Sequence, residues 1–427
     1  MKIEELYEYF LQCKTISTDT RKIESDSLFF ALKGDNFDAN EFAQQALNKG
    51  AAFVVIDNKK FLTDQEKMIL VPDSLKTLQE LAKYHRQELG LPIIALTGSN
   101  GKTTTKELIN VVLSKKYKTK ATVGNLNNHI GVPLTLLSFN ENTDIGIVEM
   151  GANHQKEIEM LCQIAQPDYG YITNFGKAHL EGFGGVEGVI KGKSELYQYL
   201  EEHQKTAFVN LDDPTQREKS NKLNRITFSQ SEKADIQIDS IEANPMVKIG
   251  YNNQTVNSHL IGIYNANNIN AAITIGNYFN VPDSDIKAAI ENYTPANNRS
   301  QLMEKNGNQI ILDAYNANPS SMAAAIANFI QLDASAKIAI LGDMFELGTE
   351  SLAEHKKVIE LLNNEPTIET HFVGNDFYTN KIEIKHFHFH NSFESFASAF
   401  KNNKPTNKTI LIKGSRGMAL ERTLELL

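Results

Sequence analysis

The chain has few cysteines, no excess of basic residues and no long apolar run, and each shortage excludes a class of protein. Its two cysteines among 427 residues, Cys13 and Cys162, have neither a metal-ligand spacing nor the number that a disulfide framework needs. We interpret both as packed thiols. The formal net charge of -9 argues against a general binder of nucleic acid or of membrane surfaces, because such proteins carry a basic face. No apolar run approaches the roughly twenty residues that span a bilayer.

These shortages indicate a cytoplasmic protein that does not insert into membranes. Residues 1–12 mix Glu4, Glu5 and Glu8 with apolar residues, so we expect no secretory signal peptide there. A reducing compartment fits two unpaired cysteines. Apolar content of 41% and charged content of 22% are typical of a globular protein, and the length suggests about three domains.

The strongest chemical signal is a strand, a glycine-bracketed turn and a helix in direct succession. A short apolar run over residues 93–96 leads into Gly98-Ser-Asn-Gly101, after which Lys102 and Thr103 open a segment with apolar residues at helical spacing. In such a turn successive backbone N–H groups face an anion, and the helix N-terminus adds partial positive charge. We therefore predict a nucleotide phosphate site at Gly98, Ser99, Asn100, Gly101, Lys102, Thr103 and Thr104.

Within this loop we expect Lys102 to reach the outer phosphates and the Thr103 hydroxyl to hold Mg²⁺. The spacing is shorter than that of the general phosphate-binding loop, since Leu96 stands where the longer motif has its first glycine. The alternative interpretation is an ordinary glycine-rich turn.

Two further residues follow strands of the same region. Glu149 lies close to the end of an apolar strand predicted over 144–150, and His179 follows a strand predicted over 169–174. The carboxyl ends of parallel strands face the ligand crevice, so Glu149 is placed where a metal could reach it, and His179 could bind a metal through a neutral ring nitrogen. The alternatives are a satisfied polar residue at a strand end and a hydrogen-bonded surface histidine.

The alternation of elements predicts an α/β protein of three domains, with boundaries at 1–87, 88–298 and 299–427. The first domain is a small α/β unit, the second a parallel-sheet ATPase domain and the third a Rossmann-like domain. For the first domain we predict helices over 2–12 and 41–48 and strands over 27–32 and 51–56. For the third we predict strands over 309–312, 337–341, 370–373 and 409–412, and helices over 320–332, 351–363 and 392–402.

Two stretches carry residues of open function. Asn265 and Asn268 begin a helix near the end of the second domain, where their amides suit either a nucleotide base or helix capping. The tract His386-Phe-His-Phe-His390 places three imidazoles on one side if it is extended, which could bind a transition metal. Because the tract has no carboxylate or cysteine beside it in the sequence, we keep the interpretation as an edge strand.

A phosphate loop beside a carboxylate and a histidine is consistent with two divalent ions that bridge phosphates, and so with an ATP-using enzyme. A rival interpretation is a P-loop ATPase that acts as a switch or motor, in which bound nucleotide changes the affinity for a partner.

Several ordered motifs make the chain similar to the Mur ligase family of peptidoglycan synthesis. They comprise Thr97-Gly-Ser-Asn-Gly-Lys-Thr-Thr104, the segment from Gly262 to Ala272, Arg299 and Lys413-Gly-Ser-Arg416. The shortened phosphate loop is the family's own. Further motifs resemble the member that adds D-alanyl-D-alanine, among them Gly124-Asn-Leu-Asn-Asn128, Glu149-Met-Gly-Ala-Asn-His154, Asp313-Ala-Tyr-Asn-Ala-Asn-Pro319 and Gly342-Asp-Met-Phe-Glu-Leu-Gly348.

The resemblance implies a role for each matching residue. Glu149 and His179 would hold the second Mg²⁺ together with a carbamoylated lysine, for which Lys193 is the better candidate and Lys191 the weaker. Asn268 would face the adenine, Arg299 the phosphates and Asp313 the ribose. Thr18, Thr20 and Asn36 would contact the uridine nucleotide in the first domain. Tyr264 departs from the family, which has histidine at this position, and we assign it no role.

The implied activity is an ATP-dependent ligation that joins D-alanyl-D-alanine to UDP-N-acetylmuramoyl-tripeptide through an acyl phosphate, by a monomer. Lys102, Lys193, His179 and Glu149 would be its catalytic residues. A neighbouring ligase that adds a single amino acid, or glutamate to folate, is the alternative, and the motif from Asp313 to Pro319 is what separates the two.

Overall fold

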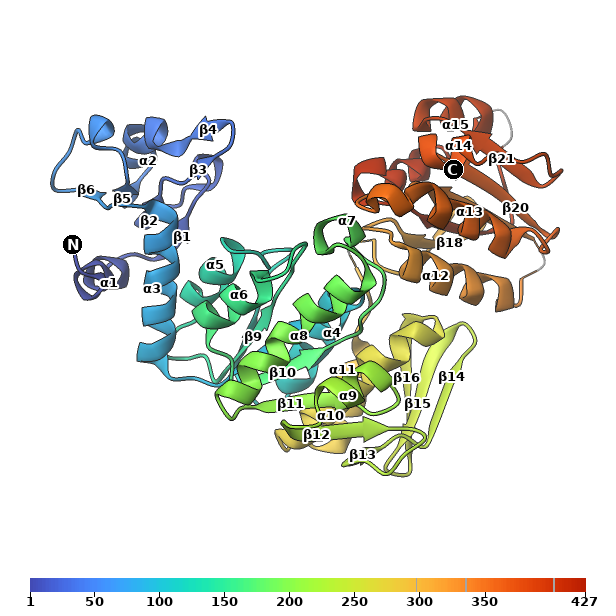
Figure 1. The fold of residues 1–427 in the computed structure, drawn as a ribbon, viewed down its shortest axis with the longest axis horizontal. Coiled ribbons are helices and arrows are strands. Elements are labelled where there is room, and N and C mark those ends of the chain that lie inside the picture. The colour runs from blue at the N-terminus through green and yellow to red at the C-terminus, as the bar shows by residue number, and fades with distance from the viewer. Residues whose placement is uncertain (297, 335, 402–403) are drawn as a thin grey trace.

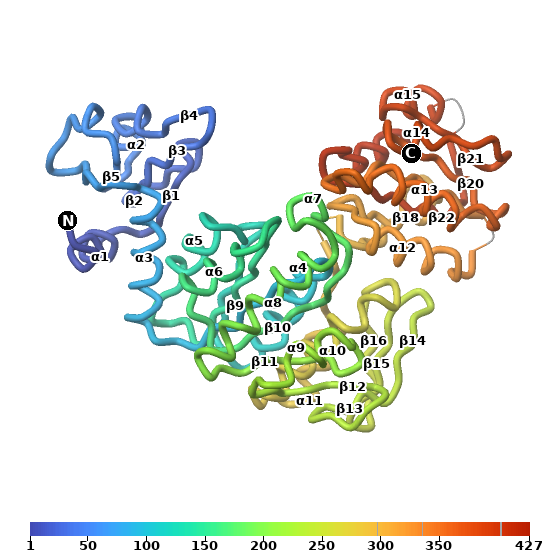
Figure 2. The backbone as a smooth tube through the Cα atoms, in the orientation of Figure 1, coloured from blue at the N-terminus to red at the C-terminus, as the bar shows by residue number. Residues whose placement is uncertain are grey.

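The computed structural model describes residues 1–296, 298–334, 336–401 and 404–427, and it arranges them as three α/β domains in chain order. The first and third domains stand on opposite sides above the second (Figure 1). The chain passes from one domain to the next without returning to an earlier one (Figure 2). The predicted α/β class is confirmed, and no helix of the described residues is both long and apolar enough to cross a bilayer.

The first domain is built on a parallel sheet of order β1-β2-β5-β6, with a two-stranded hairpin β3-β4 beside it. Its elements are α1 (Ile3–Leu11), β1 (Thr15–Ser17), β2 (Ser27–Phe30), β3 (Lys33–Gly34), β4 (Phe37–Asp38), α2 (Ala43–Asn48), β5 (Ala51–Ile56), β6 (Met68–Leu70) and α3 (Ser74–Leu89). Strand β2 is buried on both faces, as its run Ser-Leu-Phe-Phe predicts.

Helix α3 connects the first domain to the second and packs against two helices of the second domain, α5 (Gly131–Leu137) and α6 (Glu157–Ala165). Asp73 caps its start by accepting a hydrogen bond from the Lys76 N–H, and Gly90 ends it in the left-handed conformation. Its Arg86 forms an ion pair of 2.7 Å with Asp168, and both side chains are largely buried. We refer to this contact between α3 and the second domain as the first joint.

The second domain has a seven-stranded parallel sheet of order β13-β12-β11-β10-β7-β9-β8. Its remaining elements up to residue 237 are β7 (Ile93–Thr97), α4 (Lys102–Leu113), β8 (Thr119–Ala121), β9 (Ile145–Glu149), β10 (Tyr169–Ile172), α7 (Leu180–Phe183), α8 (Val186–Glu202), β11 (Thr206–Asn210), α9 (Pro214–Lys219), β12 (Asn224–Ser229) and β13 (Ile236–Gln237). Alternate residues of β7 enter different cores, because helices cover both faces of the sheet.

A three-stranded antiparallel sheet interrupts the parallel pattern of this domain. It consists of β14 (Ser240–Ala243), β15 (Met246–Tyr251) and β16 (Gln254–Ile261), and is followed by α10 (Ala266–Tyr278) and α11 (Asp283–Asn292). This sheet was not predicted, because βα repeats were expected throughout the domain. Strands β15 and β16 meet at the two-residue turn Asn252-Asn253, which needs no intervening helix.

The third domain contains a six-stranded sheet of order β17-β18-β22-β19-β20-β21, in which only β17 runs antiparallel to its neighbour among the described strands. Its elements are β17 (Gln301–Lys305), β18 (Asn308–Asp313), α12 (Pro319–Gln331), β19 (Lys337–Gly342), α13 (Ser351–Leu362), β20 (Ile368–Val373), α14 (Asn375–Thr379), β21 (Phe387–His390), α15 (Phe393–Phe400) and β22 (Thr409–Lys413). The predicted mostly parallel sheet is confirmed. Of the helix predicted over 392–402, residue 402 lies outside the described residues.

Candidate active site

The turn between β7 and α4 takes the conformation that its two glycines permit. Gly98 and Gly101 have φ of +141° and +80°. A Cβ at Gly98 would lie 2.0 Å from the Thr173 Oγ1, and one at Gly101 would lie 2.5 Å from the Asn268 Oδ1. Both positions therefore exclude side chains by their backbone conformation and by close approach to a neighbour. The glycine-bracketed turn and the helix that begins at Lys102 are present as predicted.

Two side chains of this turn, Lys102 and Ser99, form hydrogen bonds to backbone carbonyl groups. The Lys102 ammonium donates to the Gly98 carbonyl oxygen at 2.7 Å, so it lies across its own loop. Burial lowers the pKa of Lys102, against the attraction of Glu149, which raises it. The Ser99 hydroxyl donates to the Gly176 carbonyl at 2.6 Å. A lysine in this position is close to the anion that the loop would bind.

Glu149 contacts Thr103 directly, so the structure brings two of the predicted metal ligands together. The Thr103 hydroxyl donates to Glu149 Oε2 at 2.9 Å, and the Asn127 amide donates to Glu149 Oε1 at 2.8 Å. The carboxylate is 1% exposed, which makes an uncompensated charge there costly. Asn127 was assigned no role by the sequence analysis, although it belongs to the motif Gly124–Asn128. A hydroxyl and an amide thus each donate a hydrogen bond to the one carboxylate at the end of β9.

A cavity of about 740 Å³ lies between the second and third domains above this point. Most of the predicted nucleotide and metal residues line it, namely Ser99, Asn100, Gly101, Lys102, Thr103, Thr104, Glu149, His179, Asn268, Arg299 and Asp313. Within the described part of the chain, Gly98, Lys193, Thr18, Thr20 and Asn36 are not in its lining. The cavity is large enough for a ligand of nucleotide size.

Arg299 and Asp313 come from the third domain's side of the cavity. The Arg299 guanidinium lies 3.6 Å from the centre of the Tyr315 ring, and its buried Nε has no hydrogen-bond partner among the described residues. Asp313 forms an ion pair of 2.6 Å with Lys413 and accepts a hydrogen bond from the Ser300 N–H. A buried, unpartnered donor beside a phosphate loop is suited to an anionic ligand.

Both groups of the Asn268 side-chain amide form hydrogen bonds within the protein. Its Oδ1 accepts a hydrogen bond from the Thr105 hydroxyl at 3.0 Å, and its Nδ2 donates to Asn265 Oδ1 at 2.8 Å. These contacts hold α10 against α4 beneath the loop. A contact between Asn268 and an adenine stays a prediction, and in this structure the residue positions the phosphate loop.

His179 is paired across the two domains. It has φ of 52° at the start of α7, and its Nδ1 forms an ion pair with Glu346, which also has a positive φ. Burial lowers the pKa of His179, whereas Glu346 acts to raise it. Metal binding through Nδ1 therefore requires that Glu346 release the ring. Glu346 lies in the motif Gly342–Gly348, and its contact with His179 was not predicted.

Lys193 is fully enclosed under α7. Its side chain is 1% exposed, its ammonium donates to the Ala152 carbonyl at 3.0 Å, and it lies 5.0 Å from the centre of the Phe183 ring. Burial, assisted by Lys102, lowers the pKa of Lys193 well below its ordinary range. A neutral amine is the form that reacts with carbon dioxide, so the environment suits carbamoylation. Lys191 is exposed on the same helix, which supports the choice of Lys193.

Further contacts connect the second and third domains around the cavity, and we call them the second joint. Lys177 forms an ion pair of 2.8 Å with Glu354, and its N–H donates to the Ser320 hydroxyl. The Asn318 amide donates to Asn100 Oδ1 at 2.7 Å, so the third domain touches the phosphate loop. Together with the His179–Glu346 pair, these contacts place residues of the site in the joint itself.

The predicted uridine residues lie in the first domain, away from this cavity. Thr18 and Thr20 follow β1 at its carboxyl end, and Asn36 is exposed in the turn of the β3-β4 hairpin that follows β2. Strands β1 and β2 are parallel neighbours, so both loops leave the same edge of the sheet. That edge is separate from the phosphate loop.

Tyr264 occupies a position between the domains. Its hydroxyl contacts the Ser300 Oγ at 2.9 Å, and burial raises its pKa.

Lys413 and Tyr315 are further cavity residues for which no role was predicted, although both lie in the motifs quoted above. Their partners, Asp313 and Arg299, come from other segments of the chain, so only the fold could show these pairs.

A phosphate loop that faces a second α/β domain across a polar cavity is typical of enzymes that bind a nucleotide between two domains. Three family models match the chain: "Mur ligase family, catalytic domain" over residues 12–86, "Mur ligase middle domain" over 96–276 and "Mur ligase, glutamate ligase domain" over 298–416. The chain belongs to the Mur ligase family, and is therefore a ligase, so the resemblance found in the sequence is confirmed.

Individual relatives resemble the chain over nearly its whole length. The "UDP-N-acetylmuramoyl-tripeptide--D-alanyl-D-alanine ligase" of Bacillus subtilis is 35% identical over 96% of this chain and 92% of its own. The crystal structure of MurF from Acinetobacter baumannii superposes with a TM-score of 0.87 at 31% identity, covering 99% of this chain and 97% of its own. MurF from Thermotoga maritima, solved in complex with ADP, superposes with a TM-score of 0.85 at 26% identity over 98% and 97%.

Proposed function

We propose that this chain joins D-alanyl-D-alanine to UDP-N-acetylmuramoyl-tripeptide at the expense of ATP. The observation that carries the proposal is the single cavity in which the phosphate loop and the Thr103–Glu149 pair face Arg299 and Asp313 of the third domain. The names of the full-length relatives supply the substrates. We further propose a monomer in the cytoplasm, in keeping with two free cysteines.

The reaction has two steps. A terminal carboxylate oxygen of the tripeptide attacks the γ-phosphorus of ATP, ADP leaves, and an acyl phosphate forms. The amine of D-alanyl-D-alanine then attacks the acyl carbon, the amide bond forms as phosphate leaves, and the amine loses a proton. Because both steps consist mainly of placing reactants and balancing charge, closing the domains around the cavity contributes more than any one side chain.

We assign the nucleotide to the residues that line the cavity. Backbone N–H groups between Gly98 and Thr104 would bind phosphate oxygens, and Lys102 would turn from the Gly98 carbonyl to the outer phosphates. Arg299 supplies an unpartnered buried donor from the third domain. Asp313 would meet the ribose and Asn268 would lie near the base.

The residues at the end of β9 fit a first Mg²⁺. A buried carboxylate with a hydroxyl beside it offers oxygen ligands of the kind that this ion prefers, and Thr103 would then present a lone pair in place of its proton. The Asn127 amide now donates through its nitrogen and would have to turn to offer its oxygen. A bound Mg²⁺ would neutralise phosphate charge and help to hold the nucleotide. For the second ion, Glu149 would be joined by His179, whose Nε2 could bind while Glu346 keeps Nδ1, and by Lys193, which must leave the Ala152 carbonyl.

We assign the uridine nucleotide to Thr18, Thr20 and Asn36 at the sheet edge of the first domain. The tripeptide must then extend from there to the cavity, and its carboxylate would arrive opposite the phosphate loop. The match of residues 12–86 to the model "Mur ligase family, catalytic domain" supports a part for this domain in the reaction.

A coupled assay of phosphate release tests the function. We expect release only when ATP, the tripeptide nucleotide and D-alanyl-D-alanine are all present, with an equal yield of amide product. A panel of single amino acids as amine and of folate as acceptor distinguishes the neighbouring ligases. ADP release that is independent of both the tripeptide nucleotide and the dipeptide would overturn the proposal and favour a nucleotide switch.

A further inference from the structure

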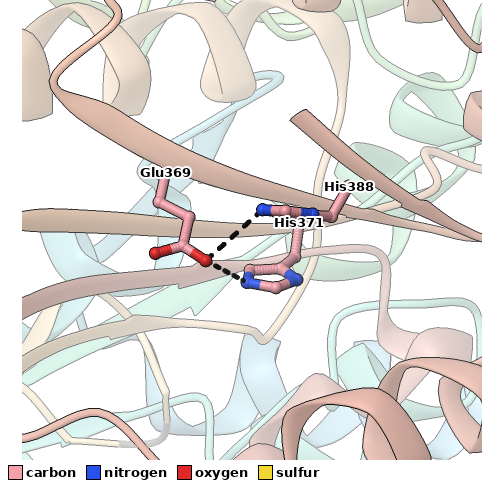
Figure 3. Close-up of side chains that lie close together, drawn as sticks. All are labelled: Glu369, His371 and His388. Carbon is pink, nitrogen blue, oxygen red and sulfur yellow. Dashed lines mark ion pairs between the residues drawn. The ribbon is translucent and has the colours of Figure 1, made fainter. Parts of the chain in front are cut away.

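A cluster of histidines with one carboxylate lies on the third domain, at the edge of its sheet and outside the proposed active site. Glu369 and His371 lie two residues apart on β20 and so share one face of the strand. The parallel register places His388 of the edge strand β21 directly beside His371. Figure 3 shows the two imidazoles directed at the same oxygen of Glu369. The carboxylate that the histidine tract lacks in the sequence is thus supplied by the neighbouring strand.

The distances in this cluster suit a metal ion better than hydrogen bonds. Glu369 Oε1 lies 3.5 Å from His371 Nε2 and 3.4 Å from His388 Nε2. Good N–H···O hydrogen bonds measure about 2.7 to 3.2 Å. Ligand atoms about 2.0 to 2.1 Å from a tetrahedral ion are roughly 3.3 to 3.4 Å apart. Two of the three separations therefore already match a tetrahedral ligand set.

The third separation needs a small movement that one residue can make. All three ligand atoms lie within 4.8 Å of one another, and the rings of His371 and His388 are stacked with centres 4.8 Å apart. The side chain of His388 is 41% exposed, so its ring can turn towards an ion without displacing the core. Glu369 is 44% exposed, which leaves a fourth position open to water.

His371 is held in place from behind. Its Nδ1 lies 3.2 Å from His390 Nε2, within hydrogen-bond distance, and its ring packs edge-on against Phe396 and Phe400 of α15. A metal-ligating histidine commonly uses its second nitrogen for such a bond, which fixes the tautomer and the ring orientation. The apolar floor also keeps the ring from rotating away. One ligand is therefore preorganised and two can adjust.

We propose that Glu369, His371 and His388 form a site for a divalent transition-metal ion, with Zn²⁺ the ion that suits it. Two imidazoles and a carboxylate with an open position are a common Zn²⁺ ligand set. Mg²⁺ prefers oxygen ligands, so the ion of the proposed active site does not compete for this one. A bound ion would tie the edge strand β21 to β20 and stabilise the third domain.

Competition with a chromophoric zinc chelator, in excess Mg²⁺, tests the site in the full chain. We expect one Zn²⁺ to bind tightly, and both Glu369→Gln and His388→Gln to weaken its binding at least tenfold. These two residues are partly exposed, so the variants should fold, which metal-free thermal unfolding would verify. His259→Gln removes an exposed histidine from another strand, β16, and should bind Zn²⁺ like the parent protein.

Two results would overturn the proposal. One is a Zn²⁺ affinity that neither variant changes. If Glu149→Gln alone abolished that binding, the ion would lie in the active site. The other is a weak, octahedral absorption spectrum of bound Co²⁺ in place of the intense tetrahedral bands that these three ligands and one water would give. Both measurements are independent of ligase activity, so failure here leaves the proposed function untouched.

Discussion

The two joints of the molecule are built from different kinds of contact. At the first joint, Arg86 and Asp168 form an ion pair with only 10% and 24% of their side chains exposed, and His85 Nε2 contacts the Phe139 carbonyl at 3.0 Å. At the second joint, the Lys177 side chain is 40% exposed and pairs with the buried Glu354, to which Lys357 offers a second ion pair. The first joint is thus costly to rearrange, because a charge would be stranded in the interior.

The difference indicates that the two joints have different roles, one in stability and one in turnover. The second joint includes Asn100 and His179, which are themselves proposed site residues, so a ligand that binds them must alter the joint. At the first joint, neither Arg86 nor Asp168 lines the cavity, and the only lining residue that α3 contacts by a described hydrogen bond is His129, through its backbone carbonyl. We expect substitutions at the first joint to change stability and substitutions at the second to change turnover.

The largest effect should come from Lys193→Ala, beneath the second joint. We expect kcat to fall at least a thousandfold, about 4 kcal/mol of activation free energy, because an anionic carbamate at the site would be lost. Nucleotide affinity, measured by calorimetry with ADP, should stay within about threefold, since Lys193 lies outside the cavity lining. Lys191→Ala on the same helix is the control. Full activity of Lys193→Ala would remove this lysine from the mechanism.

Asp168→Asn should give the next largest effect, and at the first joint. It leaves the largely buried Arg86 without its charged partner, so we expect a loss of about 3 kcal/mol of unfolding free energy, measured in urea. Lys205→Met removes the more exposed second partner of Asp168 and should cost less than about 1 kcal/mol. The kcat of Asp168→Asn below its unfolding temperature should stay near that of the parent, and a large fall would contradict the division between the joints.

Lys177→Met should have a smaller effect, on turnover alone. The buried Glu354 keeps its ion pair with Lys357, so we expect the loss of unfolding free energy to stay below about 1 kcal/mol and kcat to change no more than about fivefold. Lys357→Met breaks the contact of the same carboxylate within α13 and leaves the joint intact. If both variants alter kcat equally, the interdomain pair has no special role. Steady-state rates at low and high salt provide the measurement.

The smallest effect concerns pH at the first joint. Burial lowers the pKa of His85 below its ordinary value of about 6.5, although the Phe139 carbonyl opposes this. The unfolded chain therefore binds the proton more readily, and stability contributed by neutral His85 is lost as pH falls below about 6.5. His85→Gln should show a flatter loss of unfolding free energy between pH 7 and pH 5, while the exposed His259→Gln should follow the parent. Parallel curves for parent and His85→Gln would refute this assignment.

Local sequence was sufficient for the phosphate loop and for most strands. The run over 93–96, the two glycines and Lys102 lie within ten residues, so their geometry depends little on the rest of the chain. The antiparallel sheet β14–β16 was missed because its strands follow one another without the helices that mark the rest of the domain.

Pairs that join distant segments could not be predicted. Asn127 with Glu149, Asp313 with Lys413 and His179 with Glu346 each meet only after the domains form and pack. The same holds for Glu369 beside the histidine tract, where the sequence shows the imidazoles but not the neighbouring strand. Asn268 shows the converse, since its motif predicts a ligand contact and the fold uses its amide for internal packing.

The tight fit at Gly98 and Gly101 has a consequence for inhibition. Any side chain at these positions collides with Thr173 or Asn268, so a single substitution there damages the enzyme itself. An inhibitor that binds mainly through the backbone of this turn would therefore leave few escape mutations at its contact points. Resistance would have to arise at contacts elsewhere, such as the ion pair between Lys177 and Glu354.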